Sequence, residues 1–535
     1  MTRMLLNGDE AVAHAARDAG VSLGTGYPGT PSTEILEAFS ALGGHAQWSP
    51  NEKVALEVGL GAAFGRARVI VTMKHVGLNV AADPLFTVAY TGVDGALVIV
   101  VADDPGMASS QNEQDSRRYA IAAGVPLLEP ADSQQAYDAT LQAIEISEQW
   151  KIPVLLRLTT RVSHSKTIVA RRACSAPPAP GFTRDIPSRV MVPGYARAAH
   201  RRLRDKLEAI RDWAALPGNG TRLHAPADGG AGDGRGIIAS GVSVVHAREA
   251  APSSAVMQVL MVHPLPNQAL RAFAAEHTTT VVVEEGDPVL REGCVLAGLS
   301  PVATPAIYRF GELSVKRVAR LLAGDATLEP PPPPGKPPQL CPGCPHRVSF
   351  EILRDQQAIV SGDIGCYTLG VMPPFQAIDT TVCMGASITA GLGLRHVLPE
   401  EEARRVVSVI GDSTFMHSGL TGIAEMLYNE PPTGHVVLIL DNGTTAMTGM
   451  QEHPGTGRSL AHGPARQIVI EEVVRAMGVP HVVVLDPVAQ RQELSDNLAH
   501  ARMAGGLWVI IVRRACLLAA AKIKQYDAAN AQARD

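Results

Sequence analysis

The stretch 406–413, VVSVIGDS, decides the fold of this 535-residue chain. A short apolar run ends in a glycine and a carboxylate, which is typical of a buried parallel strand that stops at a polar turn. The pattern returns at 436–444, VVLILDNGT, after a stretch of helical character. Because the carboxyl ends of parallel strands meet at one edge of a sheet, the two turns predict a ligand site on an α/β domain.

Apolar runs of the same length occur along the whole chain. We expect strands at 69–73, 96–102 and 154–158, at 236–240, 256–262 and 280–283, and at 406–410, 436–440, 482–485 and 507–512. Runs that are apolar on both faces suit parallel strands covered by helices. The sequence therefore predicts an α/β protein with three doubly wound, parallel-sheet domains.

The composition excludes several classes of protein. Hydrophobic residues make up 46% and charged residues 19%, the net charge is -5, and no basic stripe suggests nucleic-acid binding. Asp9 and Glu10 precede any long apolar run, and no stretch reaches the ~18 apolar residues of a membrane helix. We therefore expect a cytoplasmic protein with no nucleic-acid or membrane partner, whose cysteines are buried residues or ligands rather than disulfides.

Asp412 and Asn442 follow two expected strands and lie 30 positions apart. Magnesium prefers about six oxygen ligands and usually shares them with phosphate groups. A carboxylate, an amide oxygen and a backbone carbonyl can supply the protein's part, so Asp412, Asn442 and the Thr444 carbonyl are candidate ligands. The alternative is that Asp412 caps the next helix and Asn442 forms a turn.

Two glycine-containing turns, GDIG at 362–365 and MGAS at 384–387, precede this pair. Such turns allow a close approach of the backbone to phosphates, and 385–387 is the preferred contact. Tight packing turns are the alternative. The candidate cofactor-binding residues are Gly362, Asp363, Gly365, Met384, Gly385, Ala386, Ser387, Gly411, Asp412, Ser413, Asn442, Thr444 and Thr445.

The turns after the two strands together resemble the thiamine diphosphate motif, in which Gly-Asp is followed further along the chain by Asn-Asn. Asp441 stands here in place of the first Asn. The resemblance implies thiamine diphosphate and Mg²⁺ as cofactors, with the ligands named above.

The stretch 51–63, NEKVALEVGLGAA, looks like the pyrimidine domain of thiamine enzymes, where a Glu precedes a helix of small residues. The family's helix glycine falls on Gly61. The resemblance implies that Glu52 activates the cofactor, because buried surroundings raise the pKa of such a carboxyl and favour proton sharing. Glu57 is the rival, and an acid that merely favours the helix N-terminus is the plain alternative.

Further motifs resemble the alpha subunit of indolepyruvate:ferredoxin oxidoreductase, a 2-oxoacid oxidoreductase. They are YPGTPS at 27–32, TMKHVG at 72–77, LCPGCPHR at 340–347, GDIGCYTLG at 362–370 and DNGTTAMTG at 441–449. The likeness is weakest over 170–235. We expect a pyrimidine domain at 1–170, a transketolase C-terminal-like domain at 171–329 with a mobile loop at 216–236, a proline-rich linker at 330–338, a pyrophosphate domain at 339–520 and a helical tail at 521–535.

The family likeness implies oxidative decarboxylation of an aryl 2-oxoacid, with the acyl group passing to coenzyme A and electrons to ferredoxin or another carrier. By analogy Thr30 binds the oxoacid carboxylate, Arg117 or Arg118 adds a charge-assisted contact to it, and Lys74 and His75 face the cofactor. Each of these could equally be a surface or capping residue. The expected partner is a small beta subunit, in a hetero-oligomer such as α2β2.

Cys341 and Cys344 form a chelating pair, Cys366 follows, and Cys516 lies past the last expected strand. In related oxidoreductases four such cysteines hold a [4Fe-4S] cluster. Zinc would accept the same ligands, and buried residues at the end of the linker are the plain alternative. The residues after Cys516 contain no cysteine, so we expect electrons to leave through a partner or an external carrier.

Two other functions stay open on the sequence alone. One is a non-oxidative thiamine-dependent 2-oxoacid decarboxylase or lyase that releases an arylacetaldehyde. The other is a cofactor-binding assembly subunit without turnover. The presence of Glu52, Asp412 and Asn442 together argues against the assembly subunit.

Overall fold

The computed structural model describes residues 3–230, 232–330 and 338–532. They belong to two compact units, Met1–Pro331 and Pro332–Asp535. Residues 331–337 of the predicted linker, residue 231 of the predicted loop and residues 533–535 of the predicted tail lie outside the described residues. The two units are described separately.

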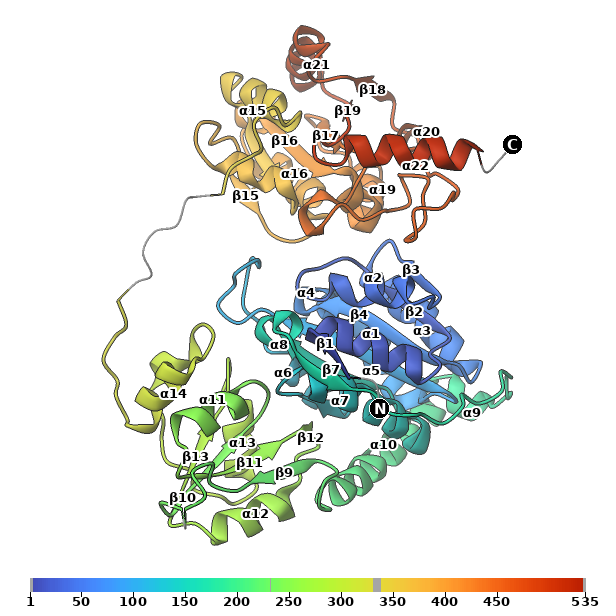
Figure 1. The fold of residues 1–535 in the computed structure, drawn as a ribbon. Coiled ribbons are helices and arrows are strands. Elements are labelled where there is room, and N and C mark those ends of the chain that lie inside the picture. Colours follow the sequence, from blue (N-terminus) through green and yellow to red (C-terminus); the bar gives the residue numbers. More distant parts are fainter. Residues whose placement is uncertain (1–2, 231, 331–337, 533–535) are drawn as a thin grey trace. The chain divides into compact units, whose positions relative to one another are not determined.

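A seven-stranded sheet, in the order β12-β6-β7-β5-β4-β2-β3, forms the centre of the first unit (Figure 1). All neighbours are parallel except β12, which pairs antiparallel with β6. The strands are β2 (Leu23–Gly26), β3 (Ala46–Trp48), β4 (Arg68–Lys74), β5 (Ala96–Asp103), β6 (Leu127–Leu128), β7 (Val154–Thr159) and β12 (Met261–His263). Strands β4 and β5 are buried along their whole length, as expected for a sheet with helices on both faces.

The helices that connect these strands alternate with them along the chain. They are α1 (Gly8–Asp18), α2 (Thr33–Ala41), α3 (Glu52–Phe64), α4 (His75–Val80), α5 (Ala82–Thr91), α6 (Ser116–Ala123), α7 (Ser133–Trp150) and α8 (Thr160–His164). Helix α1 packs against α2 and α7, and α3 packs on β2 and β4. A small antiparallel pair, β1 (Arg3–Leu6) and β8 (Thr167–Ala170), joins the two ends of this region.

A second sheet of the first unit has the order β13-β10-β11-β9. Strands β10 (Arg235–Ala239), β11 (Ala255–Val259) and β13 (Thr279–Val283) are parallel, and β9 (Thr221–His224) is an antiparallel edge. The associated helices are α9 (Ile186–Arg189), α10 (Pro193–Ala214), α11 (Ser243–Ala250), α12 (Asn267–Ala275), α13 (Val289–Leu296) and α14 (Val315–Leu322).

Two predictions about the middle region are wrong in part. The expected strand 256–262 is two strands, because β11 pairs in the second sheet whereas β12 crosses to the first. The backbone amides of Leu260 and Met261 both donate to the Gly220 carbonyl, at 2.9 and 3.0 Å, and this interrupts the run. The loop expected at 216–236 contains strand β9. The sequence did not predict this strand, because only Thr221 in it is buried and it therefore has no apolar run.

The second unit contains a six-stranded, fully parallel sheet in the order β15-β14-β16-β17-β19-β18 (Figure 1). The strands are β14 (Ile359–Gly362), β15 (Thr380–Thr381), β16 (Val406–Gly411), β17 (His435–Asp441), β18 (His481–Leu485) and β19 (Leu507–Arg513). The helices are α15 (His346–Asp355), α16 (Ala386–Val397), α17 (Glu400–Ala403), α18 (Asp412–Thr414), α19 (Leu420–Tyr428), α20 (Ile470–Met477), α21 (Arg491–Ala504) and α22 (Ala520–Gln532).

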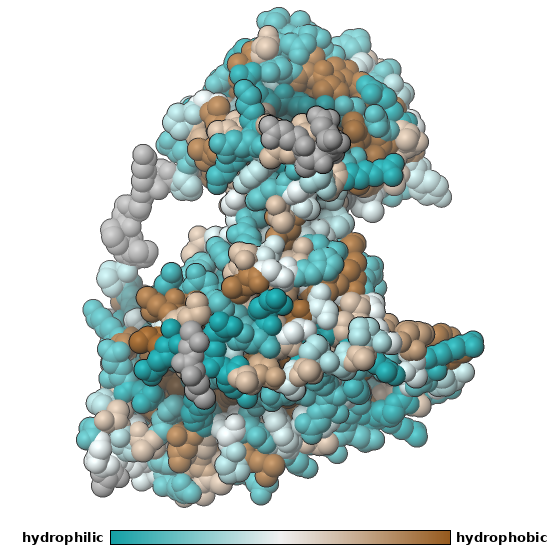
Figure 2. Space-filling view, turned by 45° about the vertical axis from the view of Figure 1, so that its right-hand side comes forward, coloured by the Kyte–Doolittle hydropathy of each residue, from teal (hydrophilic) through white to brown (hydrophobic). Residues whose placement is uncertain are grey.

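The mostly parallel sheets confirm the predicted α/β fold class. Apolar clusters lie on both faces of the six-stranded sheet, one around Phe350 and Leu438 and the other around Phe415 and Ile439. Hydrophilic residues cover most of the molecular face in Figure 2, with apolar residues in separate patches. Among the described residues, no helix combines the length and the hydropathy that a membrane crossing requires.

Candidate active site

Asp412 begins the short helix α18 at the carboxyl end of β16 and is buried. Its Oδ1 accepts a hydrogen bond from the Ser413 amide (2.9 Å), and its Oδ2 accepts from the amides of Asn442 (3.2 Å) and Gly443 (2.8 Å). The Nε2 of His453 lies 3.3 Å from Oδ2. Burial alone would raise the pKa of Asp412, but His453 and the amide donors outweigh it and lower this pKa below its ordinary value.

Asn442 and Thr444 lie directly after the adjacent strand β17 and are also buried. The Asn442 Oδ1 accepts from the Thr444 amide (3.1 Å), and its Nδ2 lies 3.3 Å from His346 Nε2. Burial lowers the pKa of His346 to about 4, so the ring is neutral and Nε2 can accept from the amide. Ser413 Oγ and Thr445 Oγ1 are 2.7 Å apart and link the two turns.

These groups fit a magnesium ion. The structure brings a carboxylate and an amide oxygen together at the carboxyl edge of neighbouring parallel strands, as the spacing predicts. Mg²⁺ prefers oxygen ligands, and backbone N–H groups fix the position of both of these oxygen-bearing side chains. His346 and His453, which approach Asn442 and Asp412, were missed, because their position depends on tertiary packing that no local spacing reveals.

Asp441, which departs from the thiamine diphosphate motif, has a partner of its own. Its Oδ2 accepts from Arg513 Nε at 2.7 Å, and Arg513 also pairs with Glu471 (2.6 Å). Burial and the neighbouring Asp412 charge raise the pKa of Asp441 to about 6, although Arg513 opposes the shift. The negative charge that Asp441 introduces in place of the motif's asparagine is therefore paired with Arg513 of the neighbouring strand β19.

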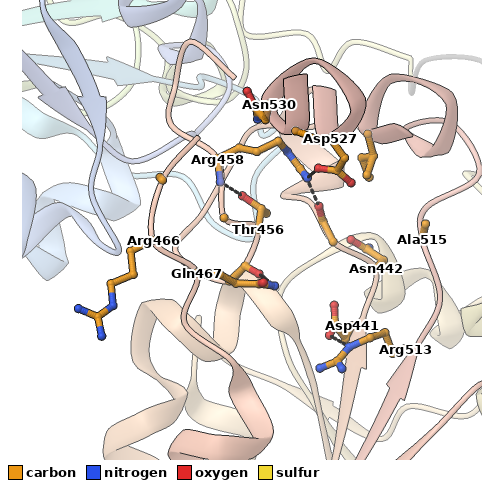
Figure 3. A pocket seen from close by; sticks show the side chains of 16 residues that line it. Asp441, Asn442, Thr456, Arg458, Arg466, Gln467, Arg513, Ala515, Asp527 and Asn530 are labelled. Carbon is orange, nitrogen blue, oxygen red and sulfur yellow. Dashed lines mark hydrogen bonds and ion pairs between the residues drawn. The ribbon is translucent and has the colours of Figure 1, made fainter. Parts of the chain in front are cut away.

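A cavity of about 720 Å³ opens beside Asp441 and Asn442. Figure 3 shows the Asp441–Arg513 pair in one part of it and Arg458 with Asp527 of helix α22 in another. The Arg458 Nη1 donates to Asp527 at 2.8 Å and so fastens the 453–467 loop to that helix. The carboxyl edge of this sheet is thus concave and polar, as a ligand site of a parallel sheet should be.

The glycine turns predicted to bind phosphate have internal roles in this structure. Gly385 has a φ of +89°, and a Cβ there would lie 2.5 Å from Ser418 Cβ, so only glycine fits. The amides of Gly385 and Ser387 donate to the two oxygens of Asp363, at 2.9 and 3.0 Å. Asp363 therefore caps α16 and engages donors that a phosphate would need. The structure thus shows the packing and capping roles that were the alternative interpretation of these turns. Phosphate binding by the turns stays a prediction.

The four predicted cluster ligands line one cavity of about 90 Å³, together with His346 and Asn442. These ligands are Cys341, Cys344, Cys366 and Cys516. Burial and the neighbouring thiols raise the pKa of Cys366 to about 11. The Cys516 amide donates to the Asn442 carbonyl at 2.9 Å, so the cysteine cavity directly adjoins the candidate magnesium ligands.

In the first unit, the turn 27–32 lies beside Lys74 at the end of β4. A Cβ at Gly29 would lie 2.9 Å from Lys74 Cβ, so the glycine permits this approach. Ser32 Oγ closes the turn by donating to the Gly29 carbonyl at 2.8 Å. The structure therefore places Thr30, which is partly buried, and Lys74 at the same carboxyl edge of the seven-stranded sheet.

Lys74 and His75 are both buried and both contact the 109–112 segment. The Lys74 Nζ donates to the Ser109 carbonyl at 2.7 Å, and His75 Nε2 lies 3.2 Å from the Asn112 carbonyl. Burial lowers the pKa of both side chains. A lysine and a histidine with lowered pKa values in one place are typical of a functional site.

Glu52 is the first residue of α3 and is only 5% exposed. A Cβ on Gly77 of α4 would lie 2.5 Å from Glu52 Oε1, so the carboxyl packs directly against this glycine. The rival Glu57 has a 44% exposed side chain and pairs with Lys53. Burial therefore favours Glu52 over Glu57 as the activating acid, a role that stays a prediction.

The two arginines predicted to bind substrate point elsewhere. Arg117 is fully buried, and its guanidinium donates to Asp115 and to Glu284 Oε2 (2.7 Å) at the end of β13. Arg118 is exposed and pairs with Glu292 (2.6 Å). The structure supports a role for Arg117 in joining the two sheets of the first unit, and nothing among the described residues directs either guanidinium toward Thr30.

Comparison with known families agrees with this geometry. The family model of the thiamine pyrophosphate enzyme C-terminal TPP-binding domain matches residues 363–512. The thiamine diphosphate-binding model of pyruvate flavodoxin/ferredoxin oxidoreductases matches residues 14–173. A solved 2-oxoglutarate:ferredoxin oxidoreductase from Magnetococcus marinus has a similar fold, with a TM-score of 0.51, 16% identity and coverage of 61% of this chain and 65% of that chain. The fold and the site thus define a thiamine diphosphate-dependent enzyme.

Relatives along the whole chain narrow this class. The indolepyruvate oxidoreductase subunit IorA of Methanothermobacter thermautotrophicus is 37% identical over 98% of this chain and 88% of its own length. The IorA subunit of Thermococcus kodakarensis is 38% identical over 96% of this chain and 86% of its own length. The chain belongs to this family of IorA subunits, and it is a subunit of a thiamine-dependent oxidoreductase that converts a 2-oxoacid oxidatively. The non-oxidative lyase and the assembly subunit are not favoured.

Proposed function

We propose that the chain is the large catalytic subunit of an enzyme that decarboxylates an aryl 2-oxoacid oxidatively and transfers the acyl group to coenzyme A. The relatives named indolepyruvate oxidoreductase support an aryl substrate. The solved 2-oxoglutarate:ferredoxin oxidoreductase, which holds coenzyme A and succinyl-CoA, supports the acyl acceptor. The observation that carries the proposal is that the four cysteines and Asn442 line one cavity, since this puts a candidate electron acceptor beside the candidate magnesium ligands.

The proposal gives each side chain a defined task. Thiamine diphosphate, when bound, supplies the carbanion chemistry. Asp412, Asn442 and the Thr444 carbonyl would hold its magnesium ion. Glu52 would share a proton with the pyrimidine ring, and the partly buried Thr30 would donate to the oxoacid carboxylate.

The cysteine cavity suits an iron–sulfur cluster better than a single zinc ion. Tetrahedral zinc with bonds of about 2.3 Å needs sulfur atoms about 3.8 Å apart. Among the described residues, no three of these Sγ atoms lie within 4.8 Å of one another. A [4Fe-4S] cluster attaches each thiolate to a different iron and therefore spans wider spacings. We propose such a cluster as the exit for electrons.

The proposed assembly includes a small beta subunit, in a hetero-oligomer such as α2β2, and an external carrier of the ferredoxin type. The names of the relatives support a partner subunit, because each describes one subunit of an indolepyruvate oxidoreductase. The cytoplasmic location stays a prediction.

Anaerobic purification together with the small subunit tests the proposal. We expect about four iron and four sulfide ions per chain, and reduction of ferredoxin that depends on both an aryl 2-oxoacid and coenzyme A. Cys366→Ser should lose the cluster, whereas Cys383→Ser, an exposed cysteine outside the cavity, should keep it. Release of an aldehyde at the same rate without any acceptor would overturn the oxidative assignment.

A further inference from the structure

Asp9, Glu34 and His164 meet in the first unit and take no part in the site described above. Asp9 lies in the first turn of α1, Glu34 lies in the first turn of α2, and His164 ends α8. One carboxylate oxygen from each acid and one ring nitrogen of His164 lie within 4.8 Å of one another. Three separate helices thus bring two carboxylates and an imidazole to one point.

Asp9 is the most unusual member of the cluster. It is fully buried, and neither of its carboxylate oxygens has a hydrogen-bond partner among the described residues. The Oε2 atom of Glu34 is also buried without a partner. Burial and the Glu34 charge raise the pKa of Asp9 well above its ordinary value, although the nearby Ser163 hydroxyl opposes this shift. Burying such a charge is unfavourable unless a cation or a proton compensates it.

We propose that Asp9, Glu34 and His164 bind one divalent metal ion of the manganese or zinc type. Both metals accept carboxylate oxygen and imidazole nitrogen as ligands. Bonds of about 2.1 Å require ligand atoms roughly 3 to 3.5 Å apart, so any wider spacing within the 4.8 Å limit must close around the ion. The exposed His164 side chain can make this adjustment, and its open side admits the ion and water ligands.

The site has a structural consequence for the first unit. Helix α2 begins directly after the turn 27–32, which carries Thr30. A metal ion shared by α1, α2 and α8 would therefore anchor the start of α2 and, with it, the turn proposed to hold the oxoacid. The proposed ligands of this ion are different residues from those proposed for the magnesium of the coenzyme, which are Asp412, Asn442 and Thr444.

Manganese binding to the full-length chain tests this site. Mn²⁺ suits oxygen-rich sites and thiolates select softer metals, so the four cysteines should not interfere. In chelator-treated protein with thiamine diphosphate present, titration followed by electron paramagnetic resonance should show about two bound Mn²⁺ per chain, given the donor sets of the two sites. Asp9→Asn should remove one, Asp412→Ala should remove the other, and the double variant should bind none.

Two further variants separate a ligand from a merely structural residue. Glu10→Gln removes a carboxylate from the same turn of α1 while keeping the capping box, and it should keep both ions. His164→Ala, an exposed change that leaves the fold intact, should lose the same ion as Asp9→Asn. Wild-type stoichiometry in both Asp9→Asn and His164→Ala would overturn the metal site in favour of a proton shared by Asp9 and Glu34. Full binding in Asp412→Ala would instead overturn the magnesium assignment alone.

Discussion

Asp412 and Asp9 are both buried aspartates in the first turn of a helix, one in each unit, yet their surroundings are opposite. Asp412 accepts hydrogen bonds from three backbone amides and lies beside His453, and its pKa is lowered. Asp9 has no such donor among the described residues, and its pKa is raised. Burial alone therefore does not decide whether an acid is ionised.

The difference shows how a protein prepares a carboxylate for a cation. Amide donors stabilise the Asp412 anion in the absence of an ion, so the proposed magnesium site would need no rearrangement of this residue. Asp9 depends on the cation, or on a proton, for compensation. Glu52, the proposed activating acid, is a further buried carboxyl, and it packs against Gly77. Four substitutions test how the surroundings of these buried acids determine what each acid does.

Replacing Glu52 by Gln should have the largest effect on turnover. An amide cannot exchange a proton with the pyrimidine ring, so we expect kcat to fall by about 10²- to 10⁴-fold. Coenzyme affinity, measured by calorimetry, should stay within about 3-fold of wild type, because Gln keeps the shape that packs on Gly77. Glu57→Gln is the matched control and should have near-normal kcat. Near-normal kcat in Glu52→Gln together with a large loss in Glu57→Gln would assign the activating role to Glu57.

Asp412→Ala should weaken magnesium-dependent coenzyme binding by at least about 100-fold, since even the outer partners of metal ligands contribute 10- to 100-fold. The measurement is calorimetric titration of thiamine diphosphate at fixed Mg²⁺. Asp441→Asn is the control, because it restores the residue of the motif and removes only the acid that Arg513 compensates. Unchanged coenzyme affinity in Asp412→Ala would show that Asp412, with its three amide donors, caps a helix and does not bind a metal ion.

The sequence revealed the strands that are long and apolar. Strands β16, β17, β18 and β19 lie within one residue of their predicted ranges, because each apolar run is bounded by a polar residue or a glycine. Strand β15 escaped prediction because it has two residues, both exposed. The sequence did not predict that β12 pairs in a different sheet from β11. The chain changes its hydrogen-bond partners at Leu260, which is itself apolar, so the run of apolar residues does not indicate the change.

The site was predictable where its residues share a local motif. Asp412 and Asn442 come together as expected because each directly follows a strand of one sheet. Substrate binding by Arg117 stays a prediction, and the sequence did not reveal that its guanidinium pairs with Glu284, an acid 167 positions away. His453 was missed for the same reason. Pairings between distant residues depend on the packed fold, which one sequence does not display.

His346→Ala should have a smaller effect than loss of Asp412, because this ring acts through Asn442. Its neutral Nε2 lies 3.3 Å from Asn442 Nδ2 and orients the amide oxygen. We expect coenzyme affinity to fall by about 10-fold, the lower end for an outer partner of a metal ligand. His346→Gln, which retains an acceptor, should recover part of the loss. His396→Ala, an exposed histidine on α16, should match wild type, and equal losses in both alanine variants would point to general destabilisation.

Glu285 extends the comparison to a third buried acid, with one amide donor, from Leu313 at 2.7 Å. Burial raises its pKa to about 7, although that amide and Arg157 oppose the shift. As pH rises from about 4.5 to 7, the unfolded chain loses this proton while the folded chain keeps it. The contribution of Glu285 to stability is therefore present at low pH and lost through this window, by at most about 1.4 kcal/mol per pH unit.

Glu285→Gln cannot ionise and keeps the oxygen that accepts from Leu313, so it should gain stability relative to wild type as pH rises and then level off above pH 7. The gain should appear as a rise of a few degrees in the apparent Tm of the variant relative to wild type, measured from pH 5 to 8. Glu145→Gln, which removes an exposed ion pair with Arg172 and is not among the groups that shift the pKa of Glu285, should give a profile parallel to wild type. Parallel profiles for both variants would mean that Glu285 is ionised throughout, and that one amide donor with Arg157 is enough to stabilise a buried carboxylate.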